Sequence, residues 1–266
     1  MVAATLFLTG FATTILTFEA TKNSLPKRPN FVGRNVPTSA GTALLPIILT
    51  TIGLGAGSLV GVWWDGTLLA GYLLLAVVVG YIDDVWGGSE SRGFAGHFGA
   101  LSRGRVTTGM VKVLVLVGGA LFVGRYFFGF GFEMFVGAFL LAGCANLGNL
   151  FDLRPGRAMK FAGGPAIPLL FLAPGWAVLA VIGVMGGAFS LFYFDLKARM
   201  MLGDAGATVV GAILGCLVVA SGPSLVWWVA GAAVVVLTFI AEFSSISKVI
   251  EEVGVLRWLD LLGRDA

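Results

Sequence analysis

The chain has 266 residues, of which 58% are hydrophobic and only 12% are charged, and its formal net charge at pH 7 is +3. A soluble protein of this length needs far more charge on its surface, so this composition indicates a protein that lies mostly in a lipid bilayer. The small net charge gives no sign of nucleic-acid binding, and 2 cysteines with 1 histidine support neither a disulfide framework nor a zinc site.

Nine apolar runs predict an all-α, polytopic membrane protein, because each run can cross all or most of a bilayer as a helix. The first run has no Lys or Arg before Lys22, unlike a signal peptide, and is interpreted as a retained span. The sixth run contains Pro165 and Pro168, which predict a bent or broken helix. The predicted spans are residues 1–20, 38–63, 67–83, 106–124, 132–150, 161–173, 176–194, 205–220 and 225–243.

Loop charge orients these spans in a cell membrane. If the N-terminus is outside, every Lys and Arg except Arg125 falls on the inner side, and the positive-inside rule then fixes this orientation. The C-terminus is then inside, and residues 244–266 are predicted to form a cytoplasmic amphipathic helix on the membrane surface. We find no internal repeat, so residues 1–266 are interpreted as one membrane domain, with close helix packing at Gly-x-x-x-Gly patterns such as Gly211 and Gly215.

Carboxylate and amide side chains gather at three helix ends that this topology places on the inner side. They are Asp83 and Asp84 after the third span, Asn146, Asn149 and Asp152 around the end of the fifth, and Asp204 at the start of the eighth. Unpaired carboxylates at a membrane surface are costly, so a cation is expected, and carboxylate and amide oxygens suit Mg²⁺. Asn146 and Asn149 are three residues apart and share one helical face.

The surroundings of Asp204 also suit a phosphate. Gly203 and Gly206 let backbone N–H groups at a helix N-terminus approach an anion, and Arg154 and Arg157 add positive charge suited to a diphosphate. Each signal alone has a simpler explanation: a glycine-flanked Asp is usually a helix cap, and an Asn in a span usually bonds a neighbouring helix. Their joint occurrence on one side of the membrane favours a binding site.

Four short segments follow one another along the chain: Pro-Thr-Ser-Ala-Gly at 37–41, Tyr-Ile-Asp-Asp at 81–84, Asn-Leu-Gly-Asn-Leu-Phe-Asp at 146–152 and Met-Leu-Gly-Asp-Ala-Gly at 201–206. In the same order they resemble the PTMGG, FxDD, NxxNLxD and FMGDxG motifs of the polyprenyl-phosphate N-acetylhexosamine-1-phosphate transferases. This family includes the phospho-MurNAc-pentapeptide translocase and the GlcNAc-1-phosphate transferases. The segments span most of the chain, so their order is more specific than any single motif.

The resemblance implies an enzyme of cell-envelope glycan synthesis that transfers a sugar-1-phosphate from a UDP-sugar to a polyprenyl phosphate and releases UMP. The active site would lie on the cytoplasmic side, use Mg²⁺ or Mn²⁺, and be open to membrane lipid; a homodimer is left open. The roles implied by motif position are Asp83 and Asp84 as the catalytic pair, Asp204 and Asn149 as metal ligands, and Asn146, Asp152, Arg154, Arg157 and Thr38 as nucleotide- and phosphate-binding residues.

Departures from the family pattern keep two alternatives open. Pro155 stands where the family has a second Asp, Gly87 where many members have a lysine, and no histidine-rich inner loop follows the ninth span. The chain could therefore be a non-catalytic homologue that binds or carries lipid-linked sugars, or a transferase with another nucleotide donor. The inner loop 92–105 could supply some donor contacts, although an interfacial segment on anionic lipid is favoured, and His97 is given no catalytic role.

Overall fold

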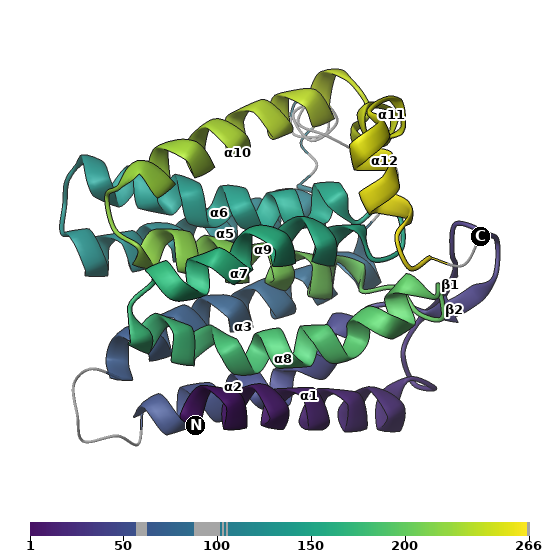
Figure 1. Ribbon diagram of the computed structural model, residues 1–266, viewed down its shortest axis with the longest axis horizontal. Helices are drawn as coiled ribbons and strands as arrows, with labels where there is room; N and C mark the ends of the chain where they lie inside the picture. The colour runs from purple at the N-terminus through teal and green to yellow at the C-terminus, as the bar shows by residue number, and fades with distance from the viewer. Residues whose placement is uncertain (57–62, 88–101, 103, 105, 265–266) are drawn as a thin grey trace.

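Helices fill almost the whole chain, because a backbone in lipid must satisfy its own hydrogen bonds. The computed structural model describes residues 1–56, 63–87, 102, 104 and 106–264 (Figure 1). A helix lies at every predicted span: α1 Val2–Thr21, α2 Leu45–Ala56, α3 Trp63–Trp86, α5 Thr108–Phe128, α6 Phe132–Phe151, α7 Arg157–Leu172, α8 Gly175–Leu196, α9 Gly203–Ala220 and α10 Leu225–Phe243.

Within the described residues, 7 helices are long and apolar enough to cross a membrane, namely α1, α3, α5, α6, α8, α9 and α10. The protein is therefore a membrane-embedded helical bundle. The helices at the second and sixth predicted spans are shorter, with 12 residues in α2 and 16 in α7. The count of nine crossings stays a prediction for these two.

The two prolines of α7 do not break it. The helix continues through Pro165 and Pro168 to Leu172 as one element, so it is not broken there, and a bend stays a prediction. A proline removes one N–H donor and crowds the carbonyl one turn earlier, and in a membrane helix bundle packing compensates for this loss.

Small residues let α9 run through the middle of the bundle (Figure 1), where residues 205–219 are all buried. A Cβ atom at Gly148 of α6 would lie 2.1 Å from the Ala207 carbonyl oxygen, and one at Gly211 would lie 2.2 Å from the Cys144 carbonyl oxygen. Neither glycine can be replaced without moving a backbone. The close packing predicted from glycine spacing is confirmed at α9.

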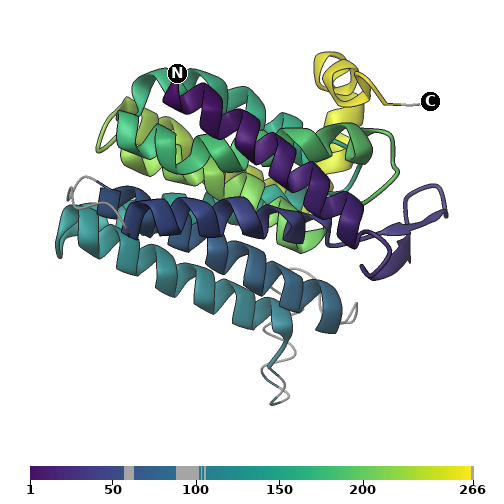
Figure 2. The same cartoon turned by 90° about the horizontal axis from the view of Figure 1, so that it is seen from below.

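Glycines also allow close packing of α1 against α8 on the outside of the bundle (Figure 2). A Cβ atom at Gly10 would lie 1.8 Å from the Gly183 carbonyl oxygen, and one at Gly186 would lie 2.1 Å from the Phe7 carbonyl oxygen. Backbone-to-backbone contact of this kind replaces the hydrophobic effect, which does not drive association inside lipid.

The polar segments gather at one end of the bundle, here called the polar end. It holds the last turns of α1, α3, α6, α8 and α10, the first turns of α5, α7 and α9, and the antiparallel hairpin of β1 (Lys27–Pro29) and β2 (Asn35–Pro37), which leads into the 3-10 helix η1 (Ala40–Leu44). Figure 1 shows the hairpin and the C-terminal tail at this end, whereas Arg125 lies in the last turn of α5 at the other.

The tail was predicted as one amphipathic helix and is instead two short ones, α11 (Ile246–Glu252) and α12 (Gly254–Leu261). Val253 between them has extended backbone angles, and the glycine that follows weakens helix continuation. The amphipathic character remains in α12, since Asp260 is buried while Val255 and Trp258 are exposed.

Candidate functional site

The carboxylate of Asp84 closes the N-terminus of α9. Its Oδ1 accepts a hydrogen bond from the Asp204 N–H at 2.9 Å, and its Oδ2 accepts one from the Ala205 N–H at 3.1 Å. These N–H groups have no partner within their own helix, and the helix dipole favours an anion there. The last turn of α3 and the first turn of α9 are thereby joined.

Two glycines make this approach sterically allowed. A Cβ atom at Gly80 of α3 would lie 2.4 Å from the Asp204 carbonyl oxygen. Gly203 has a left-handed φ of 68°, and a Cβ atom there would lie 2.5 Å from Asp84 Oδ2. A side chain at either position would push Asp84 away from the amides it binds.

The neighbouring carboxylate, Asp83, points to a different helix, as the 100° rotation between adjacent helical residues predicts. Its Oδ2 lies 2.6 Å from Lys112 Nζ, and its Oδ1 accepts a hydrogen bond of 2.5 Å from the Thr108 hydroxyl, both on α5. Lys112 also forms an ion pair with Asp204. We call Asp83, Asp84, Asp204 and Lys112 the carboxylate centre.

Of the two carboxylates that bind Lys112, that of Asp204 is more accessible to solvent. Its side chain is 36% exposed, against 15% for Asp83 and 12% for Lys112. A ligand arriving from the polar end would therefore reach Asp204 first.

Asn149 is connected to the same helix start through Thr208. The Thr208 hydroxyl lies 3.0 Å from Asn149 Oδ1 and 2.6 Å from the Asp204 carbonyl oxygen. Asn146 is half-buried one turn earlier in α6. The third motif segment thus meets the fourth through one shared hydroxyl.

Residues 37–41 lie beside residues 201–202 in a short backbone ladder. The Met201 N–H donates to the Pro37 carbonyl at 2.8 Å, and the Gly41 N–H donates to the Leu202 carbonyl at 3.1 Å. A Cβ atom at Gly41 would lie 2.1 Å from Gly206, so the first and fourth motif segments touch through bare backbone. The hairpin adds a contact to the second segment, because Arg28 donates to the Asp84 carbonyl at 2.6 Å.

A cavity of about 140 Å³, here called the polar pocket, opens next to this junction. Its wall includes Gly203, adjacent to Asp204, and three of the predicted nucleotide- and phosphate-binding residues, Thr38, Asp152 and Arg154. The Arg154 guanidinium carbon lies 5.9 Å from the centroid of the Phe31 ring, which also lines the pocket. A cation, an aromatic ring and carboxyl groups therefore face one small volume.

Among the residues that the structure describes, no basic side chain is seen to bond the pocket carboxyls of Asp152 and Asp195. Asp195 is buried and accepts a hydrogen bond of 2.8 Å from the Gly156 N–H. Burial, and then the nearby carboxylates of Asp195 and Asp204, raise the pKa of Asp152 well above its usual range. Asp152 therefore keeps its proton to a higher pH than a solvent-exposed aspartate does.

Arg157, also predicted to bind a diphosphate, does not line the polar pocket. It is 3% exposed, and its guanidinium binds the Asp260 carboxylate through two hydrogen bonds of 2.8 Å. Lys160 likewise donates to three carbonyl oxygens of the tail, at Leu259, Asp260 and Leu262. Of the nearby cations expected to face a diphosphate, Arg154 alone is in the pocket wall.

The fit to a divalent cation is partial. In residues 1–56, 63–87 and 106–264, no group of 3 or more His, Cys, Asp or Glu side chains is placed to hold a metal ion. Asp84 is occupied by backbone amides, and Asp83 and Asp204 share the Lys112 ammonium. The donor set suits a Mg²⁺ held by one or two carboxylates together with substrate phosphate oxygens, and not a site made of protein ligands alone.

Sequence reasoning missed Lys112, although a signal was available. It is the single charged residue in the predicted span 106–124, and an ionisable residue inside an apolar span indicates function by default. Asp195, near the end of the seventh span, carried the same signal. The predictions for loop 92–105 and for His97 fall outside the residues that the structure describes.

Comparison with known proteins adds no assignment. Neither the scan against protein-family models nor the search of curated proteins gives a match to this chain. The geometry of the polar end is therefore the main support for a functional proposal.

Proposed function

We propose that this protein is a transferase that moves a sugar-1-phosphate, N-acetylhexosamine-1-phosphate, from a UDP-sugar to a polyprenyl phosphate and releases UMP. One observation carries the proposal: four segments far apart in the sequence, which resemble the four motifs of such enzymes, meet at one end of a membrane bundle. They meet around the carboxylate centre and the polar pocket, where a diphosphate and its nucleoside would bind next to each other.

The chemistry asks little of the protein beyond positioning and charge. An oxygen of the acceptor phosphate forms a bond to the β-phosphorus of the donor, and the bridging oxygen leaves with UMP. A phosphate monoester is already largely deprotonated near pH 7, so no strong base is required. Arg154 would orient the diphosphate, and Asp83 or Asp84 would accept any remaining acceptor proton.

Mg²⁺, or Mn²⁺ in its place, would neutralise the diphosphate oxygens when bound. Asp204 is the first ligand we assign, because it is the most open carboxylate that faces Lys112. Asn149 would contribute its amide oxygen from the adjacent turn of α6. When the metal binds, the Lys112 ammonium would either move away from Asp83 and Asp204 or remain as a positive charge next to the metal.

The proposed enzyme crosses the cell membrane nine times, with its N-terminus outside and its polar end in the cytoplasm. Charge supports this orientation, because each described Lys and Arg except Arg125 belongs to an element or loop of the polar end.

The orientation can be tested by labelling Arg34→Cys and Arg125→Cys variants with a maleimide that does not cross the membrane. Cys144 and Cys216 are buried, so the background is low. In intact cells we expect labelling at position 125 and none at 34; the reverse pattern overturns the orientation.

A second candidate is a non-catalytic protein that binds lipid-linked sugars with the same pocket. It is favoured by Lys112, whose ammonium already pairs with two carboxylates that a metal-dependent transferase would need. Purified protein supplied with polyprenyl phosphate, Mg²⁺ and a panel of nucleotide sugars separates the two. The transferase releases UMP and forms a lipid-linked sugar with at least one donor, whereas a binder retains its ligand and forms no product.

A further inference from the structure

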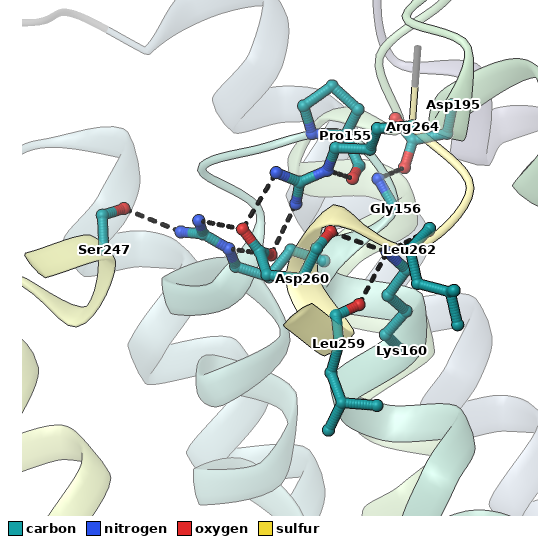
Figure 3. Close-up of polar contacts among 10 residues, drawn as sticks. Pro155, Gly156, Lys160, Asp195, Ser247, Leu259, Asp260, Leu262 and Arg264 are labelled. Atoms are coloured by element: carbon teal, nitrogen blue, oxygen red, sulfur yellow. Dashed lines mark hydrogen bonds and ion pairs between the residues drawn. The ribbon is translucent and has the colours of Figure 1, made fainter. Parts of the chain in front are cut away.

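The C-terminal tail is fastened to the bundle by a buried ionic cluster (Figure 3). The Asp260 carboxylate of α12, 9% exposed, lies between Arg157 of α7 and Arg264. Arg157 also binds the Ser247 hydroxyl at 2.7 Å, which holds α11 in place. Burial alone would raise the pKa of Asp260, but hydrogen bonds from the two arginines outweigh it and hold that pKa below its usual range. We call Asp260, Arg157 and Arg264 the tail cluster.

The tail cluster reaches the wall of the polar pocket. Arg264 Nε donates a hydrogen bond of 2.8 Å to the carbonyl oxygen of Pro155, and Pro155 lines that pocket. The next residue, Gly156, donates its N–H to Asp195, which lines the pocket from α8. The short loop 152–156 is therefore held at Pro155 by the tail and at Gly156 by α8.

The loop is a tight turn with two local backbone hydrogen bonds, from the Leu153 N–H to the Phe151 carbonyl at 2.8 Å and from the Arg157 N–H to the Arg154 carbonyl at 3.2 Å. Gly156 adopts a left-handed φ of 71°, and a Cβ atom there would lie 2.7 Å from Leu196 Cδ1. Leu153 and Arg154 are exposed, so they add little packing. The contacts at Pro155 and Gly156 tie this turn, which carries Asp152 and Arg154, to the tail and to α8.

We propose that Asp260 and Arg264 are positioning residues that hold loop 152–156 in the shape that forms the polar pocket, so that the tail sets the affinity for the nucleotide donor. The inference rests on the proposed function for the identity of that donor. A tail that only anchors the protein to the membrane would use the exposed apolar face of α12, such as Trp258, and would leave the loop unaffected.

The kinetic test uses Arg264→Met, which removes the hydrogen bond to Pro155 together with the two hydrogen bonds from Arg264 to Asp260, and which keeps the pair of Arg157 and Asp260. We expect KM for UDP-N-acetylglucosamine to rise about tenfold, the typical effect of losing a hydrogen bond from a charged group, with kcat within about twofold. Arg264→Lys, which keeps a donor, should restore part of the loss. The matched control is Lys248→Met, which removes an exposed tail ion pair of 3.9 Å with Glu252. Equal KM values for Arg264→Met and Lys248→Met overturn the proposal.

A second readout needs no turnover. Hydrogen exchange of the full chain in nanodiscs should show faster exchange of amides 153–158 in Arg264→Met, by about tenfold, with amides 246–252 unchanged. Unchanged exchange at 153–158, or equal acceleration through α11, contradicts positioning by Arg264. If the wild-type protein releases no UMP from any of the donors, the transferase proposal fails. The hydrogen-exchange result alone then decides whether the tail holds loop 152–156.

Discussion

Two ionic clusters lie at the polar end, and they differ in how completely their charges are matched. In the tail cluster one carboxylate is bound by two arginines, and Asp260 is 9% exposed. In the carboxylate centre Asp83 and Asp204 share one ammonium, that of Lys112, while Asp84 is bound by backbone amides, and Asp204 remains 36% exposed. A matched, buried cluster fixes structure, whereas a centre with excess negative charge and an open edge is suited to a cationic or phosphate-bound ligand.

The largest expected effect is a loss of activity when the carboxylate centre, and not the tail cluster, is altered. Asp204→Asn should lower the rate of UMP release by at least about 10²-fold, since it removes the accessible carboxylate that is assigned to the metal and diphosphate. The melting temperature should stay close to that of the wild type, because the substitution reduces like-charge repulsion in the centre. Activity within a few fold of the wild type would contradict the site assignment.

The next effect separates them by stability. Asp260→Asn should lower the free energy of unfolding by about 3–5 kcal/mol, because it leaves Arg157 buried without its counter-charge. Reversible unfolding in mixed micelles measures the change. Replacing all three members of the tail cluster, as in Arg157→Met with Asp260→Leu and Arg264→Met, should restore much of the loss; a triple variant as unstable as Asp260→Asn would refute this explanation.

Replacing Lys112 should have a smaller effect, and it tests whether a metal ion binds to Asp83 and Asp204. Lys112→Met leaves Asp83 and Asp204 close together with no cation between them, so Mg²⁺ should bind about tenfold more tightly than in the wild type. The rise of the melting temperature with MgCl₂ concentration reports this affinity. An unchanged Mg²⁺ dependence would show that the metal does not use these two carboxylates.

The smallest expected effect is a pH dependence of opposite sign in two acids of the polar end. The depressed pKa of Asp260 stabilises the fold above its unfolded pKa of about 3.9, and this contribution is lost as pH falls through the lower folded value. The raised pKa of Asp152 has the reverse effect, because its ionisation costs stability above the folded pKa and that cost is relieved as pH falls.

Melting temperatures of Asp260→Asn and Asp152→Asn between pH 4 and pH 8 test these signs. Relative to the wild type, Asp152→Asn should stabilise the protein most at pH 8. Asp260→Asn should destabilise it throughout this range, and least at pH 4. The opposite trend in either variant would refute the assigned cause of that pKa shift.

Much of the fold could be predicted from the sequence, because apolar runs bounded by polar residues map directly onto helices. The run ending at Asp83 and Asp84 became α3, and the run beginning near Asp204 became α9. The tail was less predictable. The helix is interrupted by the extended backbone angles of Val253, and no proline or run of charged residues indicates this interruption in the sequence.

The site was predictable where function needs a residue type at a helix end, and unpredictable where it depends on pairing. Sequence order placed Asp83, Asp84, Asn149 and Asp204 on one side, but no local pattern indicated that Lys112 would bridge two of them. Arg157 next to Asp152 looked available for a phosphate, and only the folded tail shows that Asp260 binds it. Long-range ion pairs of this kind leave no periodic signal in the chain.

Transfer of the β-phosphorus is the most direct test of the proposed function. UDP-N-acetylglucosamine labelled with ³²P at the β position would be incubated with the purified protein, polyprenyl phosphate and Mg²⁺, followed by extraction into organic solvent. The account predicts that label enters the lipid phase with the wild-type protein and not with Asp204→Asn. Label that stays in the aqueous phase, or that enters the lipid phase equally with both proteins, would contradict it.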